Sequence, residues 1–187
     1  MTKDEFTNLF ADHVIGPLRS AGFTTTGQSL YFGDHQKQVA LIRGGGRLTR
    51  PGAVTHILAL RQPYMRETSS KLDVPCDPPR QCEHYPFLLD PQYLLHTGPG
   101  QWQFDPSRHL SKPWGRIHYA DSNEADIAHS LQQLATQILD RWLPWGDQLD
   151  PQSIIQQFDP YVENFWVARI WQEDCQNHIE NEVNNTK

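Results

Sequence analysis

Long apolar runs and cysteines are both scarce in this chain of 187 residues. No run of about 18 apolar residues occurs, so no segment resembles a membrane-spanning helix. The three cysteines are an odd number, which argues against a disulfide framework. The opening residues, Met-Thr-Lys-Asp-Glu-Phe-Thr-Asn, contain two acids and no apolar core, unlike a signal peptide. We therefore expect a cytoplasmic protein with reduced thiols and no membrane association.

Basic residues are also in deficit. The chain has 16 Lys and Arg against 22 Asp and Glu, a formal charge of −6. This balance disfavours nucleic acid as the partner. Aromatic residues, in contrast, are plentiful at 11%, enough for a sizeable core. The length suits one domain and no linker-like stretch interrupts it, so we expect a single α+β domain over residues 1–187.

Apolar spacing in the first third predicts a helix followed by strands. Thr2 and Glu5 have the spacing of a capping box, and the helix is expected to end near Ala21. Its apolar stripe recurs at three- and four-residue steps through Phe6, Leu9, Phe10, Val14 and Leu18. Short β-branched and aliphatic segments then predict an antiparallel meander with strands at 29–33, 38–43 and 54–61.

The rest of the chain alternates proline-rich and helical stretches. Prolines punctuate residues 65–113, which we expect to form an ordered excursion packed on the sheet. One more strand is expected within 114–120, then a helix from Ser122 that ends at Pro144. Helix starts at Asp150-Pro151 and Asp159-Pro160 predict a C-terminal helical segment, 150–180, that frays from Glu180. The expected fold is α+β, with an N-terminal helix, a meander of about four to five strands, helices packed on one face and this C-terminal segment.

One short run carries a family resemblance. The junction Leu18-Arg-Ser-Ala-Gly-Phe23, followed by the aromatic strand Leu30-Tyr31-Phe32, resembles the opening of the bacterial domain-of-unknown-function family 4304. The resemblance extends over about residues 5–145 and leaves 150–180 as an extension. It departs at Ala40-Leu-Ile-Arg-Gly44, where family members often carry a glutamine. Some relatives look like immunity proteins for polymorphic toxins, so the resemblance implies a toxin inhibitor.

Metal-binding signals are weak. Cys76, Cys82 and His84 offer thiolate and imidazole ligands for zinc, with a fourth from Cys175 or His96. The spacing fits no standard zinc knuckle, so we favour two ordinary thiols beside a surface histidine and expect no metal. We expect no cofactor.

Catalytic motifs are missing as well. There is no His-Glu-x-x-His, no Gly-x-Ser-x-Gly elbow and no P-loop lysine after Gly44-Gly45-Gly46. The alternative to a binding protein is a small enzyme acting on a phosphorylated or nucleotide substrate. It would use Arg47 and Arg50 with His56 or His118, two strand histidines that could meet across the sheet.

Charge is segregated along the chain. Residues 35–66 contain six basic residues and no acid, whereas 159–187 contain six acids and two basic residues. The C-terminal stretch also holds two tryptophans, of which Trp166 fits the expected buried stripe and Trp171 falls outside it. Aromatic anchors ringed by charge are typical of binding surfaces. We therefore predict a non-enzymatic, immunity-type inhibitor that binds a basic toxin domain through Glu163, Trp166, Trp171, Glu173 and Asp174. The sequence does not predict its oligomeric state.

Overall fold

The computed structural model describes residues 1–45, 48, 50–67, 78–110 and 114–185. The chain opens with α1 (Lys3–Phe10), the π-helical turn η1 (Ala11–Ile15) and α2 (Gly16–Ser20). The predicted capping box starts this helix: the amide of Thr2 donates to Glu5 Oε2 over 2.7 Å, and the amide of Glu5 donates to Thr2 Oγ1 over 3.3 Å.

Five antiparallel strands form the main sheet, in the order β1-β2-β3-β5-β6. Strands β4 and β7 pair separately, with Val54 opposite Ile117. The α+β fold and its sequential meander are thus confirmed, although the strand predicted over 54–61 is divided between β4 and β5. The strands are β1 (Thr24–Thr26), β2 (Ser29–Gly33), β3 (Gln38–Arg43), β4 (Ala53–Val54), β5 (His56–Arg61), β6 (Phe87–Leu89) and β7 (Ile117–His118).

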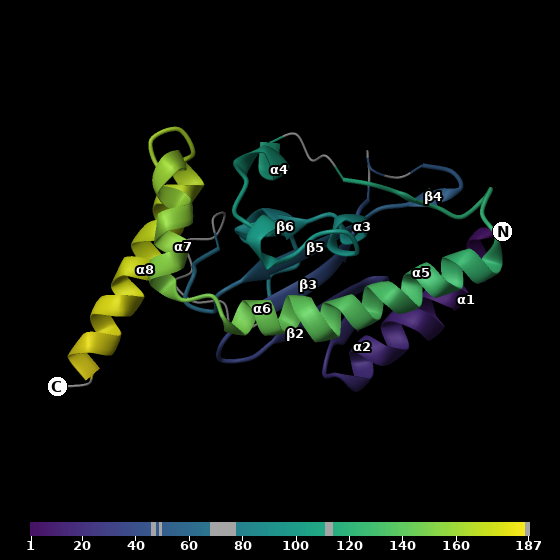
Figure 1. Cartoon of the computed structure of the whole chain (residues 1–187), viewed down its shortest axis with the longest axis horizontal. Coiled ribbons are helices and arrows are strands. Elements are labelled where there is room, and N and C mark those ends of the chain that lie inside the picture. Colours follow the sequence, from purple (N-terminus) through teal and green to yellow (C-terminus); the bar gives the residue numbers. More distant parts are fainter. Residues whose placement is uncertain (46–47, 49, 68–77, 111–113, 186–187) are drawn as a thin grey trace.

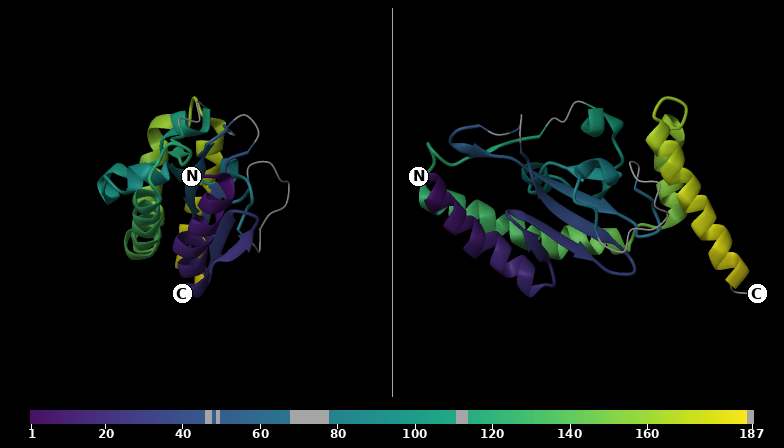
Figure 2. Two further views of the ribbon diagram at one scale, coloured as in Figure 1. Left: turned by 90° about the vertical axis from the view of Figure 1, so that its right-hand side faces the viewer. Right: turned by 180° about the vertical axis from the view of Figure 1, so that it is seen from behind.

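Helices cover one face of the main sheet. The helix α5 (Glu124–Gln137) continues through η5 (Ile138–Trp142) into α6 (Leu143–Asp147) and runs beside α1 (Figures 1 and 2). This layer and the facing sheet residues form the larger core, which includes Phe10, Leu41, Leu58, Leu131 and Trp142. The other face has a smaller core, in which Tyr85 and Trp114 pack on Ala40, Ile57 and Ala59.

The long helix does not end at Pro144, contrary to our prediction. The π turn η5 stops two residues before Pro144, just as η1 stops two residues before Pro17. In each π turn the closing amide reaches back five residues, from Leu143 to Ile138 and from Gly16 to Ala11. Proline lacks an amide hydrogen and its ring crowds the carbonyl four residues back. The wider turn shifts the carbonyls and lets both helices continue past their prolines.

The described part of the proline-rich segment is ordered, but it also supplies the edge strand β6 of the main sheet, which our prediction missed. It contains η3 (Cys82–His84), α3 (Pro91–Leu94), η4 (Pro99–Gln101) and α4 (Pro106–Leu110), and Trp102 and Phe104 are buried. Side chains of α4 reach the edge strand β6: Arg108 Nη1 lies 2.6 Å from Leu88 O, and His109 Nε2 lies 3.3 Å from Pro86 O. These contacts occupy carbonyls at a sheet edge that would otherwise be open to pairing.

The C-terminal segment is a helical pair at one end of the molecule (Figure 1). Asp150 caps α7 (Pro151–Phe158) as predicted, accepting from the amide of Ser153 over 3.0 Å. The predicted helix start at Asp159-Pro160 is only the short 3₁₀ turn η6 (Asp159–Tyr161), and α8 (Trp166–Asn185) begins later. Helix α8 remains regular beyond Glu180, where we expected fraying. None of the described helices combines the length and apolar composition that a membrane crossing requires.

Candidate functional site

The inner face of α8 belongs to the protein core. Ala168, Trp171 and Cys175 are completely buried, and α8 packs along α7 (Figure 1). The ring of Trp171 lies 6.1 Å from that of Phe158 in α7 and 6.2 Å from that of Phe104. The first half of α8 is therefore fixed by packing.

Arg66 fastens the same half of α8 by polar contacts. Its amide donates to Asp174 Oδ2 over 2.7 Å, and its Nε donates to Asp174 Oδ1 over 2.7 Å. Its Nη2 lies 3.4 Å from Glu173 Oε2, and its carbonyl accepts from Trp171 Nε1 over 3.3 Å. Trp171 and Asp174 thus make contacts within the chain, and their buried side chains have no surface to offer a partner.

The outer face of α8, which we define as Trp166, Ile170 and Glu173 together with Glu163 in the turn before the helix, has a different environment. Trp166 is 54% exposed, an unusual position for the largest apolar side chain. Ile170 is partly exposed, and Glu163 and Glu173 are exposed. Since Trp166, Ile170 and Glu173 are four and three residues apart, they lie on one side of the helix. Two of the five predicted partner-binding residues, Trp166 and Glu173, therefore share one side of the helix with Ile170, and Glu163 is exposed in the turn just before it.

The exposure of the two tryptophans is the reverse of our prediction. The sequence predicts one uninterrupted helix from Pro160, and in that helix Trp166 lies on the buried stripe. In the structure residues 162–165 lie between η6 and α8, so the helical phase restarts at Trp166. Counted from there, the apolar residues Val167, Trp171 and Cys175 recur every four positions. The sequence does show this four-residue spacing. It does not show the interruption at 162–165 that determines which residues of the helix face the core.

The basic stretch 35–66 does not form a basic surface over its described residues. Lys37 is buried, lies 3.1 Å from Asp34 and contacts Asp147 of α6. Arg61 is completely buried and donates to the carbonyls of His84 and Met65. Arg43 Nη1 donates to Thr55 O over 3.1 Å, and Arg66 binds α8. Arg50 is exposed, and Arg47 lies outside the described residues.

The two strand histidines do not form a common site. His56 lies on β5 opposite Arg43, whereas His118 lies on β7 in the second sheet, opposite Ala53. His56 is 2% exposed, and its ring stacks on that of Phe10 with centroids 4.6 Å apart. Burial, reinforced by the nearby Arg43 cation, lowers the pKa of His56 to about 3. This imidazole is neutral near pH 7 and enclosed, a poor position for a general base.

No metal site is found in the described part of the chain, where no three His, Cys, Asp or Glu residues gather in a suitable arrangement. Of the proposed zinc ligands, Cys76 lies outside that part. His84 is buried, with Nε2 4.0 Å from Glu67 Oε2, and Cys82 is partly buried. Burial raises the pKa of the Cys175 thiol to about 12, which keeps it protonated and unreactive.

The outer face of α8 is thus the candidate functional surface: a large exposed aromatic side chain with Glu173 and the exposed Arg169 on the same side of a helix fixed from behind. The residues that sequence reasoning did not single out are Ile170 and the restraining Arg66. Comparison with protein-family models, with curated proteins and with solved structures finds no match for this chain.

Proposed function

We propose that this protein is a non-enzymatic inhibitor of the immunity type, which neutralises a basic toxin domain by binding it through the outer face of α8. The exposure of Trp166 on a firmly packed helix is the observation that carries the proposal. The resemblance of residues 5–145 to a family with immunity-like members points to the same class.

Burying an aromatic side chain at an interface supplies much of the binding energy. Tryptophan is enriched among residues whose truncation costs at least about 2 kcal/mol of binding free energy. The helix is already held by Trp171 and Arg66, so binding does not have to order it, and that entropic cost is avoided. Rigid presentation therefore favours tight binding through a small surface.

Charge adds to the rate of capture. Glu163 and Glu173 flank the aromatic anchor, and the whole chain carries a formal charge of −6. A basic partner is attracted at long range by such a surface, which raises the association rate and makes it salt-dependent. A toxin domain that binds nucleic acid or cleaves it would present the required positive surface.

The enzyme hypothesis has less support. It depended on a strand histidine beside Arg47 and Arg50, and the enclosed His56 is not accessible to a substrate. His118 and Arg50 are exposed and lie in the same corner of the fold, since Ala53 forms a bridge with Arg50 and pairs with His118. The hollow that His118 lines does not include Arg50.

Photocrosslinking in the native host tests the surface. A photoreactive phenylalanine analogue replaces Trp166 in the full chain, and the matched control carries it at Arg19, an exposed position on α2. We expect one discrete adduct from position 166 and none from position 19. Equal labelling from both positions, or none from position 166, would reject the outer face of α8 as the interface.

A growth assay then tests inhibition. The captured partner is expressed alone and with this protein, and we expect it to arrest growth only when alone. W166A and E163K should lose protection, whereas Y93A, which removes an exposed aromatic from α3, should retain it. A partner that is harmless alone would refute the inhibitor function, even if the crosslink is specific.

A further inference from the structure

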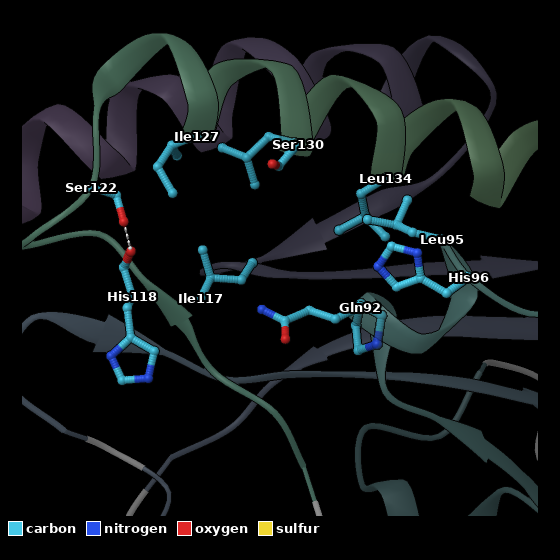
Figure 3. A pocket seen from close by; sticks show the side chains of 11 residues that line it. Gln92, Leu95, His96, Ile117, His118, Ser122, Ile127, Ser130 and Leu134 are labelled. Carbon is cyan, nitrogen blue, oxygen red and sulfur yellow. Dashed lines mark hydrogen bonds between the residues drawn. The ribbon is translucent and has the colours of Figure 1, made fainter.

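A hollow of about 410 Å³ lies between α3, α5 and β7, far in sequence from α8 (Figure 3). Apolar side chains form much of its lining, among them Leu95, Ile117, Ile127, Leu131 and Leu134. The size falls in the range of small-molecule sites, which are typically about 300–1,000 Å³. An apolar lining of this kind suits the body of a small organic ligand.

Three polar side chains at the hollow have a hydrogen already committed to the protein backbone. Ser122 Oγ donates to His118 O, and Ser130 Oγ donates to Asp126 O over 2.9 Å. Gln92 Nε2 donates to Arg116 O over 3.0 Å, and its side chain reaches into the middle of the hollow (Figure 3). Each serine hydroxyl has a single hydrogen, so both serines have only lone pairs left for a ligand. Gln92 retains its carbonyl oxygen and one amide hydrogen.

The charges around the hollow also bear on the kind of ligand that it can hold. The described lining residues include no Lys, Arg, Asp or Glu. His96 and His118 lie at opposite sides of the hollow (Figure 3). An imidazole can both donate and accept, so the surplus of acceptors comes from the two hydroxyls and the Gln92 carbonyl oxygen. Just outside, Asp121, Glu124 and Asp126 are exposed near the start of α5. This surplus of acceptors and nearby negative charge favours a donor and disfavours an anion.

We propose that this hollow binds a small molecule with an apolar body and a hydrogen-bond-donating head group, a primary amine or an alcohol. The head group donates to oxygens among those of Gln92, Ser122 and Ser130, with up to three hydrogens for a protonated amine and one for an alcohol, while the body covers Leu131 and its apolar neighbours. The site is independent of the outer face of α8, and the two proposals stand or fall separately.

The test uses three probes with one apolar body: 4-phenylbutylamine, 4-phenylbutan-1-ol and 4-phenylbutyrate. They are titrated into full-length protein with labelled Ile and Leu methyl groups, and binding is followed by NMR. We expect the amine and the alcohol to shift the methyl signals of Ile117, Ile127 and Leu131, with dissociation constants at least about tenfold below that of the carboxylate, since tenfold corresponds to about 1.4 kcal/mol. A carboxylate that binds equally well, or no binding by any probe, would overturn the proposal.

Two variants locate the site. S130F places a large ring at the hollow and should weaken binding of the amine more than tenfold, whereas N8F, an equal change at an exposed position of α1, should leave it unchanged. Thermal unfolding establishes that both variants are folded. If S130F does not fold, Q92L replaces it: loss of the amide oxygen should weaken the amine and not the carboxylate. Unchanged amine binding in the folded variant would place the ligand elsewhere and reject the site.

Discussion

The inner and outer faces of α8 use the same residue types in opposite environments. Trp171 and Asp174 are buried and contact Phe158 and Arg66, whereas Trp166 is exposed beside acids. The same contrast recurs between the enclosed His56 and the exposed His118. The role of a tryptophan, an acid or a histidine can therefore be assigned only when the helix or strand face on which it lies is known.

The break before α8 produces this contrast. Because the helix restarts at Trp166 after residues 162–165, a shift of phase turns one tryptophan inward and the other outward. The inner one stabilises the fold, and the outer one remains available to a partner. Paired substitutions on the two faces should separate stability from binding.

The tryptophan pair should give the largest difference. We expect W171A to lower the free energy of unfolding by about 3–5 kcal/mol, because it removes a completely buried indole and leaves a cavity. W166A should change it by about 0.5 kcal/mol or less, as is usual for exposed positions. Urea unfolding of both variants measures the difference. Equal losses would show that Trp166 is also part of the core.

The two acids that contact Arg66 should also differ in their contribution to stability, and the buried acid should again contribute more than the exposed one. Asp174 accepts both the amide and the Nε hydrogen of Arg66 and is buried, so we expect D174A to cost about 2–3 kcal/mol, within the range for hydrogen bonds to charged groups. Arg66 itself is partly exposed, which keeps the cost below that of a fully buried pair. E173A, at a half-exposed carboxylate, should cost about 0.5 kcal/mol or less. Similar losses in the two variants would mean that Arg66 does not distinguish them.

Local patterns in the sequence predict much of this fold. The capping box at Thr2, the strands 29–33 and 38–43 and the cap at Asp150 all depend on neighbours within a few residues, and the structure has them. The edge strand β1 was missed because Thr24–Thr26 is exposed throughout and shows no apolar alternation. The helix past Pro144 was missed because a π turn leaves no simple pattern in the residues.

The candidate site was only partly predictable. Segregated charge and two tryptophans drew attention to the C-terminal segment, where Trp166 and Glu173 lie on one side of α8 and Glu163 is exposed in the turn before it. The sequence could not show that Arg66, from the basic stretch, pairs with Asp174 from the acidic one. This contact joins residues 108 positions apart. A basic and an acidic side chain that each seemed available for a partner therefore bind each other. The hollow beside α5 has the same origin, since it arises only when distant segments pack together.

The histidine pair extends the comparison to acid stability, with the smallest expected difference. The folded pKa of His56 is about 3 and the unfolded value about 6.5, so unfolding takes up a proton at any pH between them. The contribution of His56 to stability is therefore complete above about pH 6.5 and is lost as the pH falls, by up to about 2 kcal/mol at about pH 5. Burial also lowers the pKa values of His84 and His109, which adds to the loss with the same sign. H56L should keep most of the stability near pH 7, because leucine still packs against Phe10 and the lost hydrogen bond with the Gln28 backbone costs about 1 kcal/mol. It should reduce the acid loss by about 1–2 kcal/mol. H118L, which removes an imidazole from an exposed position, is the control, and urea unfolding at about pH 7 and about pH 5 measures both variants. An H56L variant as acid-sensitive as the parent would mean that His56 is protonated in the folded state, and that enclosure does not distinguish the two histidines.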